Sequence, residues 1–354
     1  MINKYKMDIV DSIRKNVEEN FLKNKTIKKD DVVIVALSGG MDSMCLLNVL
    51  VSLSHIYEFY VCCLHVNHGI RGDEADRDLN FVVKYANDIN VKIKTVNVNA
   101  VNYSKENNKT VEEAARILRY EALTWYRDEL LNSSKVKKNI YVAVAHHKND
   151  QAETILFNMI RGTGIKGLIG IKKISNFIIR PLLDFKKEEI EEYIKKLNIP
   201  YVVDSTNEDI KYTRNFLRLK VIKDIETINS SAVDHIVSSI TDLQELYEYI
   251  EKVSDFIYEK ISYMEDENIV IKNSEFKELS HIIKVHIIRK VFNNMANKLK
   301  DISRINIEDI ISFSMKEKGG HLDMPYNITI DKKKNKLLFI KNKINVSMKN
   351  KKKK

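Results

Sequence analysis

Residues 38–43, with the sequence Ser-Gly-Gly-Met-Asp-Ser, constrain the fold of this chain more than any other segment. They follow an apolar run, residues 32–37, that is typical of a buried strand, and they precede residues 44–53, which have the character of a helix. Two adjacent glycines at such a junction let backbone N–H groups converge, and the helix N-terminus adds positive potential. The segment therefore predicts an anion site, with an ordinary serine–glycine turn as the alternative. No lysine follows the glycines, so this is not the GxxxxGK[ST] phosphate loop.

The composition of the 354-residue chain fits a soluble globular protein with room for two or three domains. Hydrophobic residues make up 44% and charged residues 31%, and no apolar run is long enough to cross a bilayer. The charged N-terminus lacks the apolar centre of a signal peptide and instead predicts an amphipathic helix through Ile9, Ile13, Val17 and Phe21. Three cysteines give no disulfide framework, so we expect a cytoplasmic protein.

The formal net charge of +10 favours a nucleic-acid partner, but much of this charge lies at one end of the chain. Residues 341–354 contain seven lysines and no acidic residue, and without them the balance falls to about +3. We expect residues 342–354 to form a basic, disordered tail. Charge alone therefore supports RNA binding only weakly.

Strand-like and helix-like segments alternate through the first part of the chain, which predicts an α/β fold with a Rossmann-like, mostly parallel sheet and helices on both faces. From about residue 224 the pattern changes to helical periodicity, and two short alternating runs then flank a lysine-rich turn. We therefore expect a first domain over residues 1–223, a smaller all-helical domain over 224–316 and a β-hairpin over 317–341.

Three polar clusters follow predicted strands or helices of this sheet: residues 65–71, residues 145–154 and the glycine-rich residues 161–170. Ligands of doubly wound sheets bind outside the carboxyl ends of the strands, so these clusters are candidate site segments. Each also has a purely structural interpretation. Asp150 and Glu153 fit a helix capping box, Arg116 and Arg119 fit a solvated helix face, and no histidine has a partner at zinc spacing.

Several long motifs, in order over residues 32 to about 220, resemble those of the tRNA(Ile)-lysidine synthetases, which belong to the pyrophosphate-loop ATPases. They are SGGMDS, HVNHGIRG, EEAARILRY, AHHKNDQAETILFNMIRGTGIKGL, RPLL at 180–183, DSTN at 204–207 and RNFLR at 214–218. The resemblance implies that residues 1–223 form an adenylation domain and that residues 224–316 contact tRNA. Longer members continue into a further C-terminal domain, which we expect this chain to lack or to stop within.

The implied reaction joins free lysine to the wobble cytidine, C34, of a tRNA(Ile) with the anticodon CAU. ATP first adenylates the C2 oxygen of the base and releases pyrophosphate, and the lysine ε-amine then attacks C2 and expels AMP. The modified base would pair with A in place of G. The sequence does not set the oligomeric state, and a homodimer is kept open.

The residues that match these motifs receive roles in this reaction. The loop residues Ser38, Gly39, Gly40, Met41 and Ser43 would hold ATP and the departing pyrophosphate, and Asp42 with Asp150 would bind Mg²⁺. The adenosine pocket would be bordered by His65, Asn67 and His68. Lysine would be bound by Glu153 and by Arg116 or Arg119, which pair with its carboxylate or with a phosphate. Contacts with tRNA would come from Arg161, Arg180, Arg214 and Arg218.

The nucleophile poses a protonation problem, because deprotonating a free ε-amine at pH 7 costs about 4.6 kcal/mol. A carboxylate beside the amine would raise its pKa further, so it must accept the proton during the attack. Glu153 is the first candidate for this proton acceptor and Asp150 is the second.

Two other functions stay open at this point. One is a tRNA thiolation enzyme with the same type of loop, although Cys45, Cys62 and Cys63 all fall in segments predicted to be buried. The other is a non-catalytic RNA-binding relative, against which the acidic residues Asp42, Asp150 and Glu153 argue.

Overall fold

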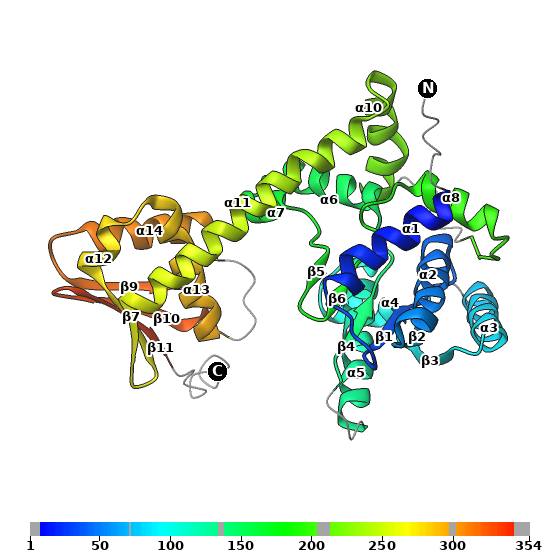
Figure 1. Ribbon diagram of the computed structural model, residues 1–354. Coiled ribbons are helices and arrows are strands. Elements are labelled where there is room, and N and C mark those ends of the chain that lie inside the picture. Colours follow the sequence, from blue (N-terminus) through cyan, green and yellow to red (C-terminus); the bar gives the residue numbers. More distant parts are fainter. Residues whose placement is uncertain (1–7, 71, 134–137, 204–212, 297–301, 343–354) are drawn as a thin grey trace, which may run out of the picture. The chain divides into compact units, whose positions relative to one another are not determined.

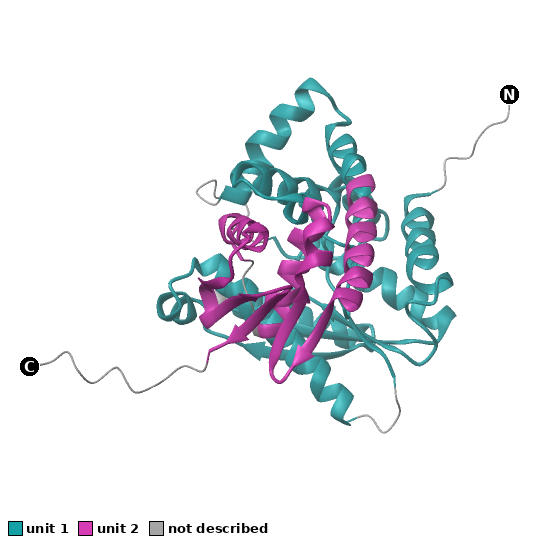
Figure 2. Cartoon of the chain, turned by 90° about the vertical axis from the view of Figure 1, so that its left-hand side faces the viewer, with its two compact units in different colours: residues 1–241 teal, residues 242–354 magenta. Residues whose placement is uncertain are grey.

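The computed structural model (Figure 1) describes residues 8–70, 72–133, 138–203, 213–296 and 302–342. Two compact units are found, residues 1–241 and residues 242–354 (Figure 2), and helix α11 (Ala232–Ile261) crosses the division between them. The domain boundaries expected from the sequence stay predictions. Arg71, the DSTN motif at 204–207 and the basic tail lie outside the described residues, apart from Asn342.

The first unit is built on a six-stranded sheet in the order β3-β2-β1-β4-β6-β5, which confirms the predicted Rossmann-like architecture. The central strand β1 pairs in parallel with β2 and β4, placing Ile34 opposite Cys62 and Val142. Strand β5 alone in this sheet is antiparallel to its neighbour. The bounds are β1 Val32–Ala36, β2 Tyr60–Asn67, β3 Lys92–Asn97, β4 Ile140–Ala143, β5 Ile174–Ser175 and β6 Ile178–Ile179.

Helices cover both faces of this sheet because alternate side chains of each strand point to opposite faces. Val33 and Val35 of β1 belong to a core with α1 (Ile9–Val17), η1 (Glu18–Lys23), α2 (Met41–Tyr57), α3 (Asp73–Asp88) and α8 (Lys187–Lys196). Ile34 belongs to the other core, with α5 (Val111–Ser133), beside which α4 (Ala100–Glu106) packs. The predicted N-terminal amphipathic helix is confirmed, since Ile13, Val17 and Phe21 are fully buried.

Helix α6 (Lys148–Ile160) follows β4 and packs on the start of α11. Its Ala152 lies in a small core with Val233 of α11, and Asp234 of α11 pairs with Lys148 Nζ at 2.9 Å and Lys186 Nζ at 2.6 Å. The short segments that follow α6 are α7 (Ile165–Leu168), α9 (Thr213–Phe216), η3 (Leu217–Val221) and α10 (Ile222–Ile228). Residues far apart in the sequence thus fix the position of α6.

The second unit combines helices with a five-stranded antiparallel sheet in the order β7-β8-β11-β10-β9. The predicted hairpin is present as β10 (Ile328–Lys333) and β11 (Lys336–Lys341). The segment expected to be all-helical also contains two strands, β7 (Ser262–Glu265) and β8 (Asn268–Lys272), which pair with each other, and β8 pairs in addition with the distant β11. The other elements are β9 (Gly320–Met324), α12 (Asn273–Glu278), α13 (His281–Ala296), α14 (Arg304–Met315) and η4 (Pro325–Asn327).

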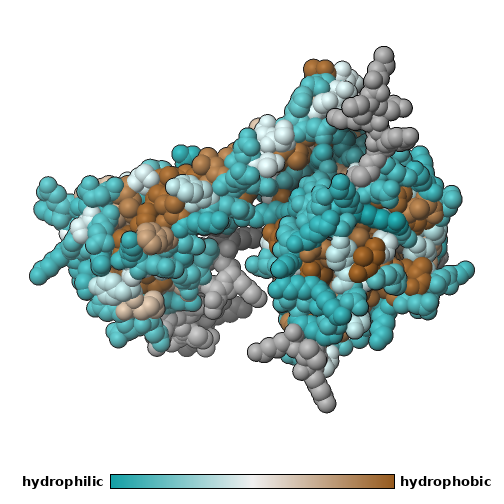
Figure 3. All heavy atoms as spheres, in the orientation of Figure 1, coloured by the Kyte–Doolittle hydropathy of each residue, from teal (hydrophilic) through white to brown (hydrophobic). Residues whose placement is uncertain are grey.

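Hydrophilic residues cover much of the visible surface, with hydrophobic residues in separate patches (Figure 3). Within the described part of the chain, no helix is both long enough and apolar enough to span a membrane.

Candidate phosphate-binding and acid–base site

The loop after β1 is shaped by its own hydroxyl groups. Ser43 Oγ accepts hydrogen bonds from the backbone N–H groups of Ser38 and Gly39, both at 3.2 Å, and donates to the carbonyl of Gly40 at 2.9 Å. Gly40 is the N-cap of α2 and makes no side-chain capping bond, so the first turn, which begins with Met41 and Asp42, keeps its amides for an anion. This geometry fits the predicted phosphate cradle.

Gly39 occupies a backbone position that only glycine adopts easily, with φ of +89°. A Cβ atom there would lie 2.9 Å from Cγ1 of Val82 and 3.0 Å from Cγ2 of Val202. The carbonyl of Gly39 also accepts a hydrogen bond from Val202 N at 3.0 Å. The loop is therefore tied to α3 and to the segment before residue 204.

We expect Gly39→Ala to lower the free energy of unfolding by about 1–3 kcal/mol, because it adds backbone strain and displaces two packed valines. Gly162→Ala is the matched control, since Gly162 also has positive φ (+69°) but open space around its Cβ position. Urea denaturation of both variants measures the difference. Equal losses of unfolding free energy in the two variants would mean that the contacts with Val82 and Val202 contribute nothing to the effect.

The end of β2 approaches this loop through a buried histidine. His65 is 5% exposed, and its Nδ1 lies 2.8 Å from the carbonyl oxygen of Leu37, directly before the loop. Asn67 Oδ1 accepts a hydrogen bond from Gly69 N at 3.0 Å and so shapes the turn that contains His68. The structure thus brings the first polar cluster to the same sheet edge as the loop, and its contact with adenosine stays a prediction.

The acidic residues of α6 are held by an arginine that lies 65 positions further along the chain. Arg218 Nε lies 2.6 Å from Glu153 Oε1 and its Nη2 lies 3.0 Å from Oε2, while the same Nη2 is 3.4 Å from Asp150 Oδ1. Glu153 is only 3% exposed. Asp150 Oδ2 accepts a hydrogen bond from His147 N at 2.9 Å, so it does cap the helix. Glu153 is an ion-pair partner and not a cap.

His147 connects the acidic cluster to the loop. Its Nε2 lies 3.4 Å from Asp150 Oδ2 and 3.8 Å from Asp42 Oδ2, and its side chain is almost fully buried. This histidine lies in the candidate segment 145–154, where no role was predicted for it. Its only signal was its position directly after β4, next to Asp150. The structure therefore joins Asp42, Asp150 and Glu153 into one cluster through His147 and Arg218.

Burial and neighbouring charges shift the pKa values of the three carboxyl groups in different directions. Burial raises the pKa of Asp42 and also that of Glu153, for which the Arg218 pair acts in the opposite direction. Burial is also the largest single influence on Asp150 and would raise its pKa. The adjacent His147 and His146, the hydrogen bond from His147 N and the charge of Arg218 together outweigh burial, so the pKa of Asp150 is lowered. Glu153 is thus the stronger base of the pair on α6.

One carboxylate oxygen of the cluster is suited to a magnesium ion, which would have to take its other ligands from phosphate groups. Asp42 Oδ1 is buried and has no hydrogen-bond partner, which is the state of a carboxylate oxygen that lacks its ligand. No group of three or more His, Cys, Asp and Glu side chains suited to a metal occurs among the described residues. Because both oxygens of Asp150 already have partners, Asp42 is the better-placed of the two predicted ligands.

The predicted arginines occupy different environments. Arg180 is 8% exposed and donates to the carbonyl of Lys172 at 2.7 Å and to His146 Nδ1 at 3.3 Å, so it is a buried residue beside the cluster. Burial is the main reason that the pKa of His146 falls to about 4, and Arg180, Arg116 and Arg119 add to this effect while Asp150 opposes it. Arg116 and Arg119 are exposed on α5.

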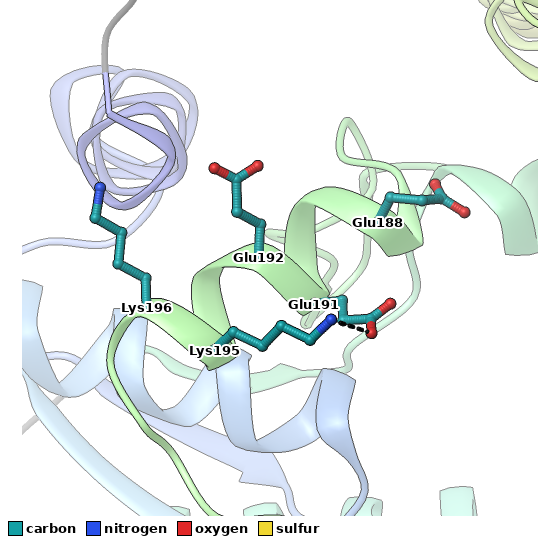
Figure 4. A pocket seen from close by; sticks show the side chains of 5 residues that line it. All are labelled: Glu188, Glu191, Glu192, Lys195 and Lys196. Carbon is teal, nitrogen blue, oxygen red and sulfur yellow. Dashed lines mark ion pairs between the residues drawn. The ribbon is translucent and has the colours of Figure 1, made fainter.

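A separate hollow lies on the surface of α8 (Figure 4), where Lys195 pairs with Glu191 at 2.8 Å. It is lined by Glu188, Glu191, Glu192, Lys195 and Lys196. None of these residues belongs to the predicted site.

A mostly parallel sheet with a glycine loop at the carboxyl end of β1 and an acidic cluster beside it defines a nucleotide-binding protein of the PP-loop class, and the PP-loop domain model matches residues 11–225. A relative from Caldanaerobacter subterraneus is 34% identical over 91% of this chain and 68% of its own length, and one from Clostridioides difficile is 35% identical over 91% and 69%. Both are tRNA(Ile)-lysidine synthases. The chain belongs to this family of ligases and spans about two thirds of the length of these relatives.

Among solved structures, the U34-tRNA thiolase NcsA from Methanococcus maripaludis has a similar fold, with a TM-score of 0.54 and 18% sequence identity. The similarity covers 67% of this chain and 79% of the thiolase. At this level of identity the comparison supports the fold alone.

Proposed function

We propose that the protein ligates free lysine to C2 of the wobble cytidine of tRNA(Ile) with the anticodon CAU, using ATP and releasing AMP and pyrophosphate. The observation that carries this proposal is the junction of the Ser38–Ser43 loop with the buried carboxylate cluster through His147. The names of the relatives supply the tRNA substrate. Lysine and the adenylated intermediate are what the resemblance to this family implies.

In the first step the C2 oxygen of cytidine attacks the α-phosphorus of ATP, and pyrophosphate leaves. Negative charge grows on the departing pyrophosphate, so the α2 N-terminus and the loop amides stabilise the transition state. Asp42 would hold Mg²⁺, which neutralises phosphate charge when it is bound. His147 lies between Asp42 and Asp150 and keeps the two carboxylates apart.

In the second step the lysine ε-nitrogen attacks C2, the bond from C2 to the AMP oxygen breaks, and the nitrogen loses its proton. Glu153 accepts this proton, because burial raises its pKa and so makes it a stronger base than an exposed glutamate. The ε-ammonium group of the free lysine substrate is a second cation, which competes with Arg218 for the Glu153 carboxylate. Arg116 and Arg119 are then available to pair with the lysine carboxylate or with a phosphate.

The test is an incubation with labelled lysine, ATP and tRNA transcripts that differ only at position 34. We expect label on the C34 transcript alone, with AMP and pyrophosphate formed in equal amounts. Label on no transcript, or ATP cleavage that does not require lysine or tRNA, would refute the assignment.

The buried cysteines separate this proposal from tRNA thiolation. Cys45, Cys62 and Cys63 are all buried as free thiols, and burial raises the pKa of Cys62 to about 11, so its reactive thiolate is scarce at neutral pH. We expect the triple variant Cys45→Ala, Cys62→Ala and Cys63→Ala to keep transferring lysine as long as it folds, because the proposed reaction uses no thiol. Thermal denaturation monitors the packing loss. A folded triple variant without activity would favour the thiolation reading.

A further inference from the structure

Helix α6 carries an aromatic residue on the same face as its catalytic carboxylates. Asp150, Glu153 and Phe157 are spaced three and four residues apart, so their side chains lie one above the other along the helix. The segment formed by α9 and η3 lies alongside: its Arg218 pairs with Glu153, and its Arg214 lies over the ring of Phe157. The wall of the acidic cluster therefore continues for one further helical turn, about 5.4 Å.

One helical turn beyond Glu153, two guanidinium groups lie near a phenyl ring, and the three residues are here called the Arg–Phe–Arg cluster (Phe157, Arg161 and Arg214). The Cζ atoms of Arg161 and Arg214 lie 5.1 Å and 5.9 Å from the ring centroid. Arg161 is exposed, and Phe157 and Arg214 are half-buried. The backbone beyond Arg161 is open as well, because a Cβ atom at Gly162 or Gly164 would meet nothing within 4 Å.

A purely structural role explains this arrangement poorly. Exposed cation–π contacts contribute only about 0.5–1 kcal/mol each, and the neighbouring Met159 and Ile160 are also exposed, at 57% and 70%. Aromatic rings and arginine planes that are accessible to solvent are, in contrast, the surfaces on which unpaired RNA bases stack. The two arginines add positive charge for the adjoining phosphate.

The spacing indicates which nucleotide this cluster would take. Successive stacked bases are about 3.4 Å apart, whereas the cluster lies one helical turn from Glu153. A strand that reaches both positions must have its bases unstacked and turned outward, as loop nucleotides are when proteins recognise them. The nucleotide at the cluster is then a direct neighbour of the base at Glu153.

We propose that Phe157, Arg161 and Arg214 form a stacking site for the unpaired nucleotide next to the cytidine that is modified. This inference rests on the proposed function, because it takes the base at Glu153 to be the target cytidine. Phe157 stacks the base, and the guanidinium groups extend the stack and pair with the phosphate between the two nucleotides.

The test combines a protein variant with an altered RNA. Phe157→Leu keeps an apolar side chain but removes the aromatic face, and the RNA is an anticodon stem–loop with an abasic site on one or the other side of the target cytidine. We expect Phe157→Leu to weaken binding of the intact stem–loop about tenfold, from the usual value of base–aromatic stacking. On the abasic RNA that lacks the stacked base, parent and variant should bind equally, because each change removes the same contact.

Tyr60→Leu is the matched control. Tyr60 also has an exposed ring with a cation above it, Lys138 at 4.6 Å. It lies at the start of β2, at the opposite end of the strand from the site. Phe157→Trp should retain binding. Arg161→Gln, at an exposed side chain, gives a second variant if Phe157→Leu fails to fold. Additive losses with both abasic RNAs, or unchanged binding by folded variants, would overturn the stacking site. Lysine transfer by the parent protein tests the proposed function separately, so the two failures are distinguishable.

Discussion

Asp42→Asn should reduce tRNA-dependent pyrophosphate release about 10³-fold, which corresponds to about 4 kcal/mol of transition-state stabilisation. The substitution keeps the shape of the side chain but removes the negative charge of a carboxylate whose Oδ1 is buried without a hydrogen-bond partner. Because burial already raises the pKa of Asp42, its loss should leave stability unchanged within about 1 kcal/mol. The measurement is pyrophosphate release at saturating ATP, together with thermal denaturation.

Asp8→Asn is the control for the loss of a negative charge. The side chain of Asp8 is 38% exposed, close to the 35% of Asp42, but it pairs with Lys196 on the surface and caps α1, where asparagine caps equally well. The activity of the Asp8→Asn variant should match that of the parent. If Asp42→Asn also kept full activity over a range of magnesium concentrations, Asp42 would not be the metal ligand.

Glu153→Gln should slow lysine transfer about 10³-fold, within the usual contribution of a general base, while adenylation of the tRNA continues. Glutamine retains a hydrogen bond to Arg218 but cannot accept the proton of the attacking amine. Adenylated tRNA should therefore accumulate, and labelling from the α-phosphate of ATP would detect it in a single turnover. In the parent, transfer should fall as the pH drops through the pKa of Glu153, which burial raises.

The Arg218 pair makes a stability control necessary for this variant. Removing one partner of a buried ion pair costs several kcal/mol, although the partial exposure of Arg218, 31%, should reduce the loss. Glu191→Gln removes an exposed pair with Lys195 and should change neither stability nor rate. Lysine transfer by a folded Glu153→Gln variant at the parent rate would restrict Glu153 to holding Arg218.

Local sequence patterns predicted the sheet and the edge at which the candidate site lies. The apolar run before Ser38 and the polar residues after β2 and β4 were sufficient, because parallel strands bring their carboxyl ends together whatever the remaining contacts are. The pair between Glu153 and Arg218 could not be predicted, since nothing local shows that residues so far apart in sequence meet. Arg218 and Arg180 were both predicted to contact tRNA for that reason, yet one pairs with the cluster and the other is buried.

The second unit shows the same limit. The turn between β10 and β11 is visible in the sequence because both strands are adjacent to it, and the hairpin was predicted. Strand β8 was not predicted, although one of its partners, β7, is adjacent in the sequence. Its apolar run is only three residues long, 269–271, and also fits a helix, while its other partner, β11, lies more than sixty residues away.

The contacts of Val233 and Asp234 with α6 bear on how a catalytic fragment of this protein would have to be cut. A polypeptide that ends at residue 223 would uncover Ala152 and leave Lys148 and Lys186 without their shared acidic partner. One that ends at residue 241 would retain both the apolar and the ionic support of the helix that carries Asp150 and Glu153. Truncation within the first turns of α11 would thus weaken the support of α6 even though it removes none of the predicted site residues.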